Sequence, residues 1–210
     1  GISVSGLNDK AKASISKVAE QLINQKAKSL VVCGNNNIGD QILCYAINNL
    51  LGNVGATIKF DRASYQRKGS DSELNQLLTD MKSSSVDTLI IWNSNLCYDT
   101  PFAADFTQAM TNVKTKISFN SILDETTLLC NYVCPDHHNL ESWGDVEAKR
   151  GSYSFIQPTI NPIFNTRQAA HSILTWCNSS NIDTNAEQPY YEYLKKCWQE
   201  KHATLKLSGT

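Results

Sequence analysis

The spacing of hydrophobic and polar positions along the chain predicts a succession of helices. Between residues 11 and 23, apolar residues recur three and four positions apart, which is the spacing of one helical face. The same criterion predicts a helix at 102–113. A helix at about 38–51 is apolar nearly all round, which is typical of a helix covered on most sides. Ser70 is followed three positions later by Glu73, a capping-box pattern that predicts the start of another helix.

Short apolar runs lie between these helices and predict strands. They are SLVVCG (29–34), TIKF (57–60), TLIIW (88–92) and KISF (116–119). The third run has no polar alternation, which is typical of a strand covered on both faces. Strands that alternate with helices at this spacing indicate a parallel sheet with right-handed crossovers. We therefore predict an α/β fold: an open, mostly parallel Rossmann-like sheet with helices on both faces and a helical C-terminal tail.

The same patterns suggest how the chain is organised into domains. A helix within residues 1–27 is expected to pack on one α/β domain at 28–165, and residues 166–210 are expected to supply C-terminal helices of that domain. Tail helices are predicted at about 166–177 and 189–204. Proline suits the first turn of the second of these helices, because its missing N–H costs nothing there.

A long segment with little periodicity, from Asn131 to Arg167, leads into the tail. A short helix at ETTLLC (125–130) precedes this segment, which opens with NYVCP (131–135) and contains loop 136–165. Irregular segments of this length in compact domains usually cover a site or a partner surface. Trp143 stands among polar residues of this loop, so we expect it to anchor the loop to the domain.

Composition excludes several functions. The 19 basic and 20 acidic residues leave a net charge of -1, and no basic tract appears. Nucleic acids and anionic membrane surfaces both attract clustered positive charge, so neither is an expected partner. No apolar run reaches the roughly 18 residues that a membrane span needs. The N-terminus lacks the basic-then-apolar order of a signal peptide, and the chain reads as a portion of a longer one.

Candidate metal ligands and acid–base groups are few. The seven cysteines are expected to be free thiols that pack as small hydrophobes, as in a reducing compartment or a protein folded before export. Cys130 and Cys134, with His137 and His138, have a spacing that zinc tolerates, but on a strand both cysteines would share one inward face. A mixed-charge cluster could hold an acid and a base, or only solvated and paired charges. Its members are Glu141, Asp145, Glu147, Lys149 and Arg150. We predict neither a metal site nor a catalytic residue.

Two loops follow predicted strands and could contact a ligand, because open parallel sheets bind ligands at the carboxyl ends of their strands. The first contains Gly34, Asn35 and Gly39, where glycines allow close backbone approach and a helix N-terminus attracts anions. The second contains Asn93 and Asn95, whose amides could bind a ligand's polar rim. In both loops the asparagines could instead cap a helix or bond their own backbone.

The order of motifs resembles the C-terminal part of the catalytic subunit of molybdopterin oxidoreductases. The similar stretches, within about residues 28–175, are LVVCGNNNIGDQ, AINNLLGNVGA, LIIWNSNLCYDTP and the run from ILDETTLLCNYVCP to PTINPIFNTR. In that family the corresponding region is a dinucleotide-fold domain that holds one guanine-dinucleotide arm of the bis-pterin cofactor. The chain departs from the pattern at NSN, which replaces a small residue, Asn and Pro, and at Cys130-Asn131, which replaces Ala-Asp.

The resemblance implies positions for the cofactor-binding residues. It places Gly34, Asn35 and Gly39, with Asn93 and Asn95, near the dinucleotide arm of the cofactor. It places Glu141 and Gly144 in a loop that covers the cofactor.

The segment LESWGDVEAKRGSYSFIQPTINPIFNTRQ is most similar to a branch of the family, the molybdopterin-like, iron–sulfur subunit of bacterial alternative complex III. That branch implies a scaffold without molybdenum cofactor in a quinol-oxidising respiratory complex, with iron–sulfur clusters elsewhere in the parent chain. It also implies an oxidoreductase parent on the periplasmic face of the inner membrane, partnered by other subunits, and an inactive isolated portion. The alternatives are a genuine molybdopterin guanine dinucleotide-binding domain and a generic, cytoplasmic nucleotide-binding α/β module.

Overall fold

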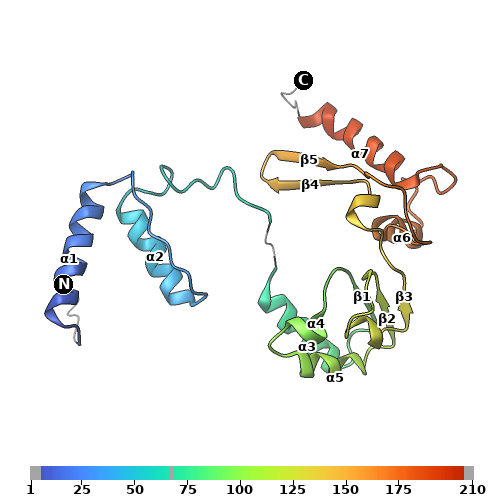
Figure 1. The fold of residues 1–210 in the computed structure, drawn as a ribbon, viewed down its shortest axis with the longest axis horizontal. Helices are drawn as coiled ribbons and strands as arrows, with labels where there is room; N and C mark the ends of the chain where they lie inside the picture. The colour runs from blue at the N-terminus through green and yellow to red at the C-terminus, as the bar shows by residue number, and fades with distance from the viewer. Residues whose placement is uncertain (1–5, 67–68, 206–210) are drawn as a thin grey trace. The chain divides into compact units, whose positions relative to one another are not determined.

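The computed structural model describes residues 6–66 and 69–205, with side chains described as far as Lys201. These residues form two compact units. The colours of Figure 1 follow residue number and so show which parts of the chain belong to each unit. The first unit contains the described residues up to Tyr65 together with Lys149–Gly151, and the second contains the rest. The sequence-based boundaries at 27/28 and 165/166 remain a prediction.

The first unit contains two capped helices. Helix α1 (Asp9–Asn24) begins where the Asn8 side chain accepts a hydrogen bond from the backbone N–H of Ala11, at 2.8 Å. Helix α2 (Ile38–Leu50) begins in the same way at Asn37, whose side chain accepts from the N–H of Asp40 at 3.2 Å. Such caps satisfy donors that have no partner within the helix. The two predicted helices are therefore confirmed.

The predicted strand at 29–34 is wrong, because this described segment is irregular. The side chain of Asn48 on α2 bonds both backbone groups of Val31: its Nδ2 donates to the carbonyl at 2.7 Å, and its Oδ1 accepts from the N–H at 3.0 Å. One side-chain amide thus makes the two hydrogen bonds that a neighbouring strand would make at this residue. Apolar sequence alone did not reveal this polar partner.

The predicted strand at 57–60 is also wrong, since the described chain makes only an isolated parallel bridge there, between Val54 and Ile58. The carbonyl of Asn53 accepts the N–H groups of Thr57 and Ile58, both at 2.9 Å, and so bends the chain into a turn. The Asn53 side chain is fully buried and donates to Asn48 Oδ1 at 2.9 Å. A polar network, rather than a strand pair, organises this unit.

A parallel three-stranded sheet lies in the second unit. Strands β1 (Thr88–Ile91), β2 (Thr115–Ser118) and β3 (Tyr132–Val133) are ordered β1-β2-β3, and both pairs are parallel. Strands β1 and β2 were predicted from their apolar runs, whereas β3 lies in NYVCP, which opens the segment expected to be mostly irregular. The α/β class and its open, parallel, Rossmann-like sheet with a helical C-terminal tail are thereby confirmed.

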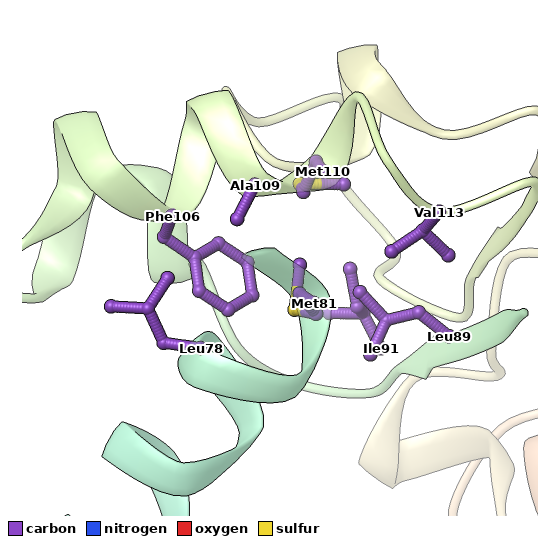
Figure 2. Packing of buried hydrophobic residues seen from close by; sticks show 8 residues of the cluster. All are labelled: Leu78, Met81, Leu89, Ile91, Phe106, Ala109, Met110 and Val113. Carbon is purple, nitrogen blue, oxygen red and sulfur yellow. The ribbon is translucent and has the colours of Figure 1, made fainter. Parts of the chain in front are cut away.

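Helices α3 (Asp71–Lys82) and α5 (Ala103–Met110) pack on β1 and form the hydrophobic core. Leu89 and Ile91 lie two residues apart on β1 and so point to the same face, where they are 8% and 3% exposed. Ile90, between them, is 46% exposed, which differs from the burial on both faces expected for this run. Figure 2 shows the core cluster, whose members are Leu78, Met81, Leu89, Ile91, Phe106, Ala109, Met110 and Val113.

Short helices and the C-terminal helices complete the second unit. The bounds are α4 (Leu96–Asp99), two 3-10 helices, η1 (Thr127–Leu129) and η2 (Asn139–Glu141), then α6 (Ala169–Trp176) and α7 (Pro189–Leu205). The predicted short helix near 125–130 and both tail helices are confirmed. Ring stacking of Trp176 on Phe119, with centroids 5.3 Å apart, joins α6 to the segment that follows β2.

Loop 136–165 contains a hairpin that the sequence analysis missed. Strands β4 (Gly144–Lys149) and β5 (Ser152–Ile156) form a two-stranded sheet and run in opposite directions (Figure 1). Only Arg150 and Gly151 separate them, and Gly151 has a φ of 74°, which glycine adopts without steric cost. The long segment was therefore predicted as more irregular than it is.

Candidate functional site

A network of polar side chains joins the segments that follow β1 and β2. Asn120 is 6% exposed, and its Nδ2 donates to the carbonyl of Ser94 and to Asp124 Oδ2, both at 2.9 Å. Its Oδ1 accepts from the N–H of Ser94 at 3.4 Å. These bonds hold the loop at 93–95 against the loop at 120–124. The position is the carboxyl edge of the sheet, where ligands of open α/β proteins bind.

Asn95, a predicted cofactor-binding residue, forms hydrogen bonds within the protein through both its amide oxygen and its amide nitrogen. Its Oδ1 accepts from the hydroxyl of Thr126 at 2.7 Å and from the N–H of Thr126 at 3.3 Å. Its Nδ2 donates to Glu125 Oε2 at 2.7 Å, and this bond lowers the pKa of the Glu125 carboxyl below its usual value. Asn95 therefore connects the loop that follows β1 to the turn at residues 125–126, just before η1. Its assignment to a cofactor stays a prediction, as does that of Asn93, which has a φ of 51°.

Asp136 completes this edge and was missed by sequence analysis. Its Oδ1 accepts from the N–H of Ala169 at 2.8 Å, at the start of α6, and its Oδ2 accepts from the indole of Trp92 at 2.7 Å. A carboxylate at a helix N-terminus is stabilised by the helix dipole. With Asp124 and Glu125, it gives the strand ends three carboxylates, a charge that disfavours a diphosphate.

In the first unit, the loop with Gly34, Asn35 and Gly39 is bonded to itself. Asn35 Nδ2 donates to Asp40 Oδ2 at 2.6 Å, and Asn35 Oδ1 accepts from the N–H of Asn37 at 3.0 Å. A Cβ at Gly39 would lie 3.1 Å from the capping Oδ1 of Asn37, so glycine suits the cap itself. A Cβ at Gly34 would meet no atom within 4 Å. Binding of a dinucleotide by these residues stays a prediction.

Glu141 fixes the loop between β3 and β4. Its Oε2 accepts from the N–H of His138 at 3.0 Å, and its Oε1 accepts from the N–H of Ile163 at 3.1 Å. The bond from Ile163 and then that from His138 lower the pKa of this carboxyl, which keeps it charged. A Cβ at Gly144 would make an ordinary 3.5 Å contact with Ile156. Contact of Glu141 and Gly144 with a cofactor stays a prediction.

The mixed-charge cluster does not hold an acid–base pair at Glu141 and Asp145. Asp145 Oδ2 accepts from the indole of Trp198 on α7 at 2.9 Å, whereas Glu141 bonds backbone amides.

All seven cysteines lie within the described residues and are free thiols. Burial raises the pKa of Cys130, which favours its neutral form. In the part of the chain that the structure describes, no three His, Cys, Asp or Glu side chains are grouped to hold a metal ion.

Trp143 joins the start of β4 to α7, as the sequence analysis expected of an anchor. Its ring stacks on Tyr191 with centroids 4.3 Å apart, and its Nε1 donates to Gln188 Oε1 at 3.1 Å. Its carbonyl accepts from Gln168 Nε2 at 2.6 Å, just before α6. Trp143 also lines a cavity of about 270 Å³ with His137, Glu141 and other loop and tail residues.

We predict that Trp143→Ala makes the segment 131–167 more sensitive to proteolysis, with cleavage roughly tenfold faster, because the ring and indole contacts that close it are lost. Limited proteolysis followed by mass spectrometry measures the rate at each site. Trp143→Phe keeps a stacking ring and loses only the indole donor, so it should be cut at an intermediate rate. Unchanged cleavage of Trp143→Ala would show that the contacts do not hold the loop.

Comparison with known proteins gives one informative relative. A stretch of 106 residues, which is 49% of the chain, is 27% identical to the menaquinone reductase, molybdopterin-binding-like subunit, of Nitratidesulfovibrio vulgaris (strain Hildenborough). The chain is similar to a molybdopterin-binding-like protein. The match spans 15% of that relative's own length. No known protein-family profile matches the chain. The similarity supports the broad molybdopterin oxidoreductase-like relationship that the motifs indicate.

Proposed function

We propose that this chain is a molybdopterin-like domain that serves as a scaffold in a respiratory quinone-linked electron-transfer complex, without a bound molybdenum cofactor. More specifically, we propose that the parent protein is the iron–sulfur, molybdopterin-like subunit of a complex of the alternative complex III type. The relative's name, which combines menaquinone reductase with molybdopterin-binding-like subunit, supports the broad role. Iron–sulfur clusters would lie elsewhere in the longer parent chain.

The observation that carries the proposal is the state of Asn95. A side chain that recognises a ligand needs donors or acceptors directed at it, but both amide groups of Asn95 bond Thr126 and Glu125. Glu125 bonds Asn95 directly, and Asp124 and Asp136 bond other residues that follow the strands, so the strand ends carry negative charge that would repel a diphosphate. These contacts support a loop that stabilises the domain rather than one that binds a dinucleotide.

The proposal also covers partners and location. Other domains of the parent and other subunits of a membrane-associated complex are the proposed partners, at the periplasmic face of the bacterial inner membrane. Among the helices of the described residues, none has the length and apolar composition needed to cross a membrane.

Titration with guanine nucleotide tests the absence of cofactor binding. Isothermal titration of the 210-residue chain with GDP is expected to give no binding heat, because the side chains of Asn35 and Asn95 bond other protein groups. Micromolar affinity for GDP with none for ADP would overturn the proposal in favour of a genuine molybdopterin guanine dinucleotide-binding domain. Equal affinity for GDP and ADP would overturn it in favour of a generic nucleotide-binding module.

A second measurement addresses the parent protein. Elemental analysis of the purified full-length complex is expected to find iron and no molybdenum, together with quinol oxidation. Stoichiometric molybdenum in the active complex would contradict the scaffold role. A parent that oxidises no quinol would contradict the respiratory assignment.

A further inference from the structure

Three basic side chains line one hollow beside the carboxyl end of β3. The hollow has a volume of about 620 Å³, and its walls are the segment 133–137 and the segment that leads into α6. The basic residues are His137, Arg167 and His171. None of these residues is in the group that family resemblance places near a cofactor.

The walls of the hollow are held by bonds within the second unit. The N–H of Cys134 donates to the carbonyl of Ser118 at 2.8 Å, which extends the pairing of β3 with β2. Asp136 caps α6 through the N–H of Ala169, so the first turn of α6 is tied to the end of β3. A hollow with both walls fixed in this way loses little entropy when a ligand binds.

Arg167 is held in place by a buried hydroxyl. Its Nε donates to Ser172 Oγ at 2.8 Å, and Ser172 is only 2% exposed. This bond uses one of the five donors that a guanidinium carries. Arginine suits the recognition of oxyanions because its donors are planar and permanently charged.

The two histidines add donors that depend on protonation. His137 Nε2 lies 3.1 Å from the carbonyl of Thr166, and a carbonyl only accepts, so Nε2 carries a proton. Its Nδ1 becomes a second donor when the ring is charged. Burial, then the charges of Arg167 and His137, lower the pKa of His171. On its other side, His171 borders the cavity that contains Glu141 and Glu187.

Positive charges that lie together repel one another unless an anion neutralises them. Cys134 is the remaining titratable side chain on the wall. The carboxylate of Asp136 is adjacent in sequence but does not line this hollow, and it bonds Ala169 and Trp92. We propose that the hollow binds a ligand carrying a tetrahedral oxyanion, a phosphate or sulfate group, held by Arg167, His137 and His171. Three side chains that can each donate match the several oxygens of a tetrahedral anion better than the two of a carboxylate.

Sulfate is the probe of choice, because it keeps its charge over the pH range in which histidines titrate. A bound anion favours the charged form of His171 and so raises its pKa, which couples binding to proton uptake. Isothermal titration of the 210-residue chain at constant ionic strength is expected to show binding at about pH 6 that is about tenfold tighter than at about pH 8. Absence of binding at the lower pH would overturn the proposal.

Variants test the residues. Arg167→Gln and, separately, His171→Asn are expected to weaken sulfate binding about tenfold, as for the loss of one charge-assisted hydrogen bond. Lys114→Gln is the matched control, because it removes an exposed charge that pairs with Asp87 elsewhere. Equal weakening by Arg167→Gln and Lys114→Gln would reveal nonspecific attraction and overturn the site. Tryptophan fluorescence melts verify that each variant is folded.

A parallel titration distinguishes an organic phosphate ester from a free inorganic anion as the ligand. A phosphate monoester such as phenyl phosphate is expected to bind more tightly than inorganic phosphate, because the hollow has room for an organic group. Binding of acetate in place of either phosphate would contradict the tetrahedral assignment. Neither result depends on guanine nucleotide binding, so failure here leaves the proposed scaffold role unaffected.

Discussion

Phe106→Ala is expected to destabilise the second unit by about 3–5 kcal/mol, the cost of removing a large aromatic side chain from a close-packed core. Phe106 is a residue of α5 and is 0% exposed, and Figure 2 shows its ring beside Leu78 of α3. Its neighbours Leu78 and Met81 belong to α3, and collapse of that helix into the cavity would require its cap at Ser70 to shift. The surrounding structure can therefore recover little of the lost energy.

Urea unfolding followed by tryptophan fluorescence measures this effect without interference from the first unit. All four tryptophans belong to the second unit, at positions 92, 143, 176 and 198. Phe164→Ala is the matched control, since Phe164 is 74% exposed and its truncation should change the unfolding free energy by less than about 1 kcal/mol. Equal losses in the two variants would contradict the core assigned to α3, α5 and β1.

Asn48→Ala is expected to destabilise the first unit by about 2–4 kcal/mol, because it leaves several buried polar groups without partners. The N–H and carbonyl of Val31 and the side chain of Asn53 all bond the Asn48 amide. A unit of this size buries little apolar surface, and a loss of this size would leave much of it unfolded. Tryptophan fluorescence of the second unit should be unchanged.

Hydrogen exchange in α2 measures the loss. Amides of this helix are expected to exchange much faster in Asn48→Ala, because exchange follows the free energy of local unfolding. Asn49→Ala is the matched control: its side chain is exposed on the same helix, one position away. If Asn48→Ala exchanged no faster than Asn49→Ala, the polar network would not be the source of this unit's stability.

Helices were predicted well because their signals are local. The caps at Asn37 and Ser70, and proline at the start of α7, all lie within a few residues of the ends they define. Strands need partners that are distant in sequence, and the run at 29–34 illustrates the failure. Its apolar pattern fits a buried strand, but Asn48 supplies the hydrogen bonds at Val31 in place of a neighbouring strand.

The candidate site was predictable in position but not in chemistry. The loop after β1 was identified because it follows a predicted strand. The contacts of Asn95, however, depend on Thr126, which is 31 residues further along the sequence. Asp136 was overlooked because a carboxylate after a strand carries no pattern of its own. Its partner, the N–H of Ala169, is contributed by a helix whose start was expected three residues earlier.

The position of β1 at the edge of the three-stranded sheet bears on how the protein avoids self-association. An edge composed of Thr, Leu and Ile, without a charge, is a template for pairing with another chain, and such edges promote aggregation. Beside its first residue, Asp87 and Lys114 form an ion pair at 2.9 Å, with both side chains exposed. The two charges flank the starts of β1 and of its neighbour β2, and charged residues that flank an apolar strand oppose its association with other chains.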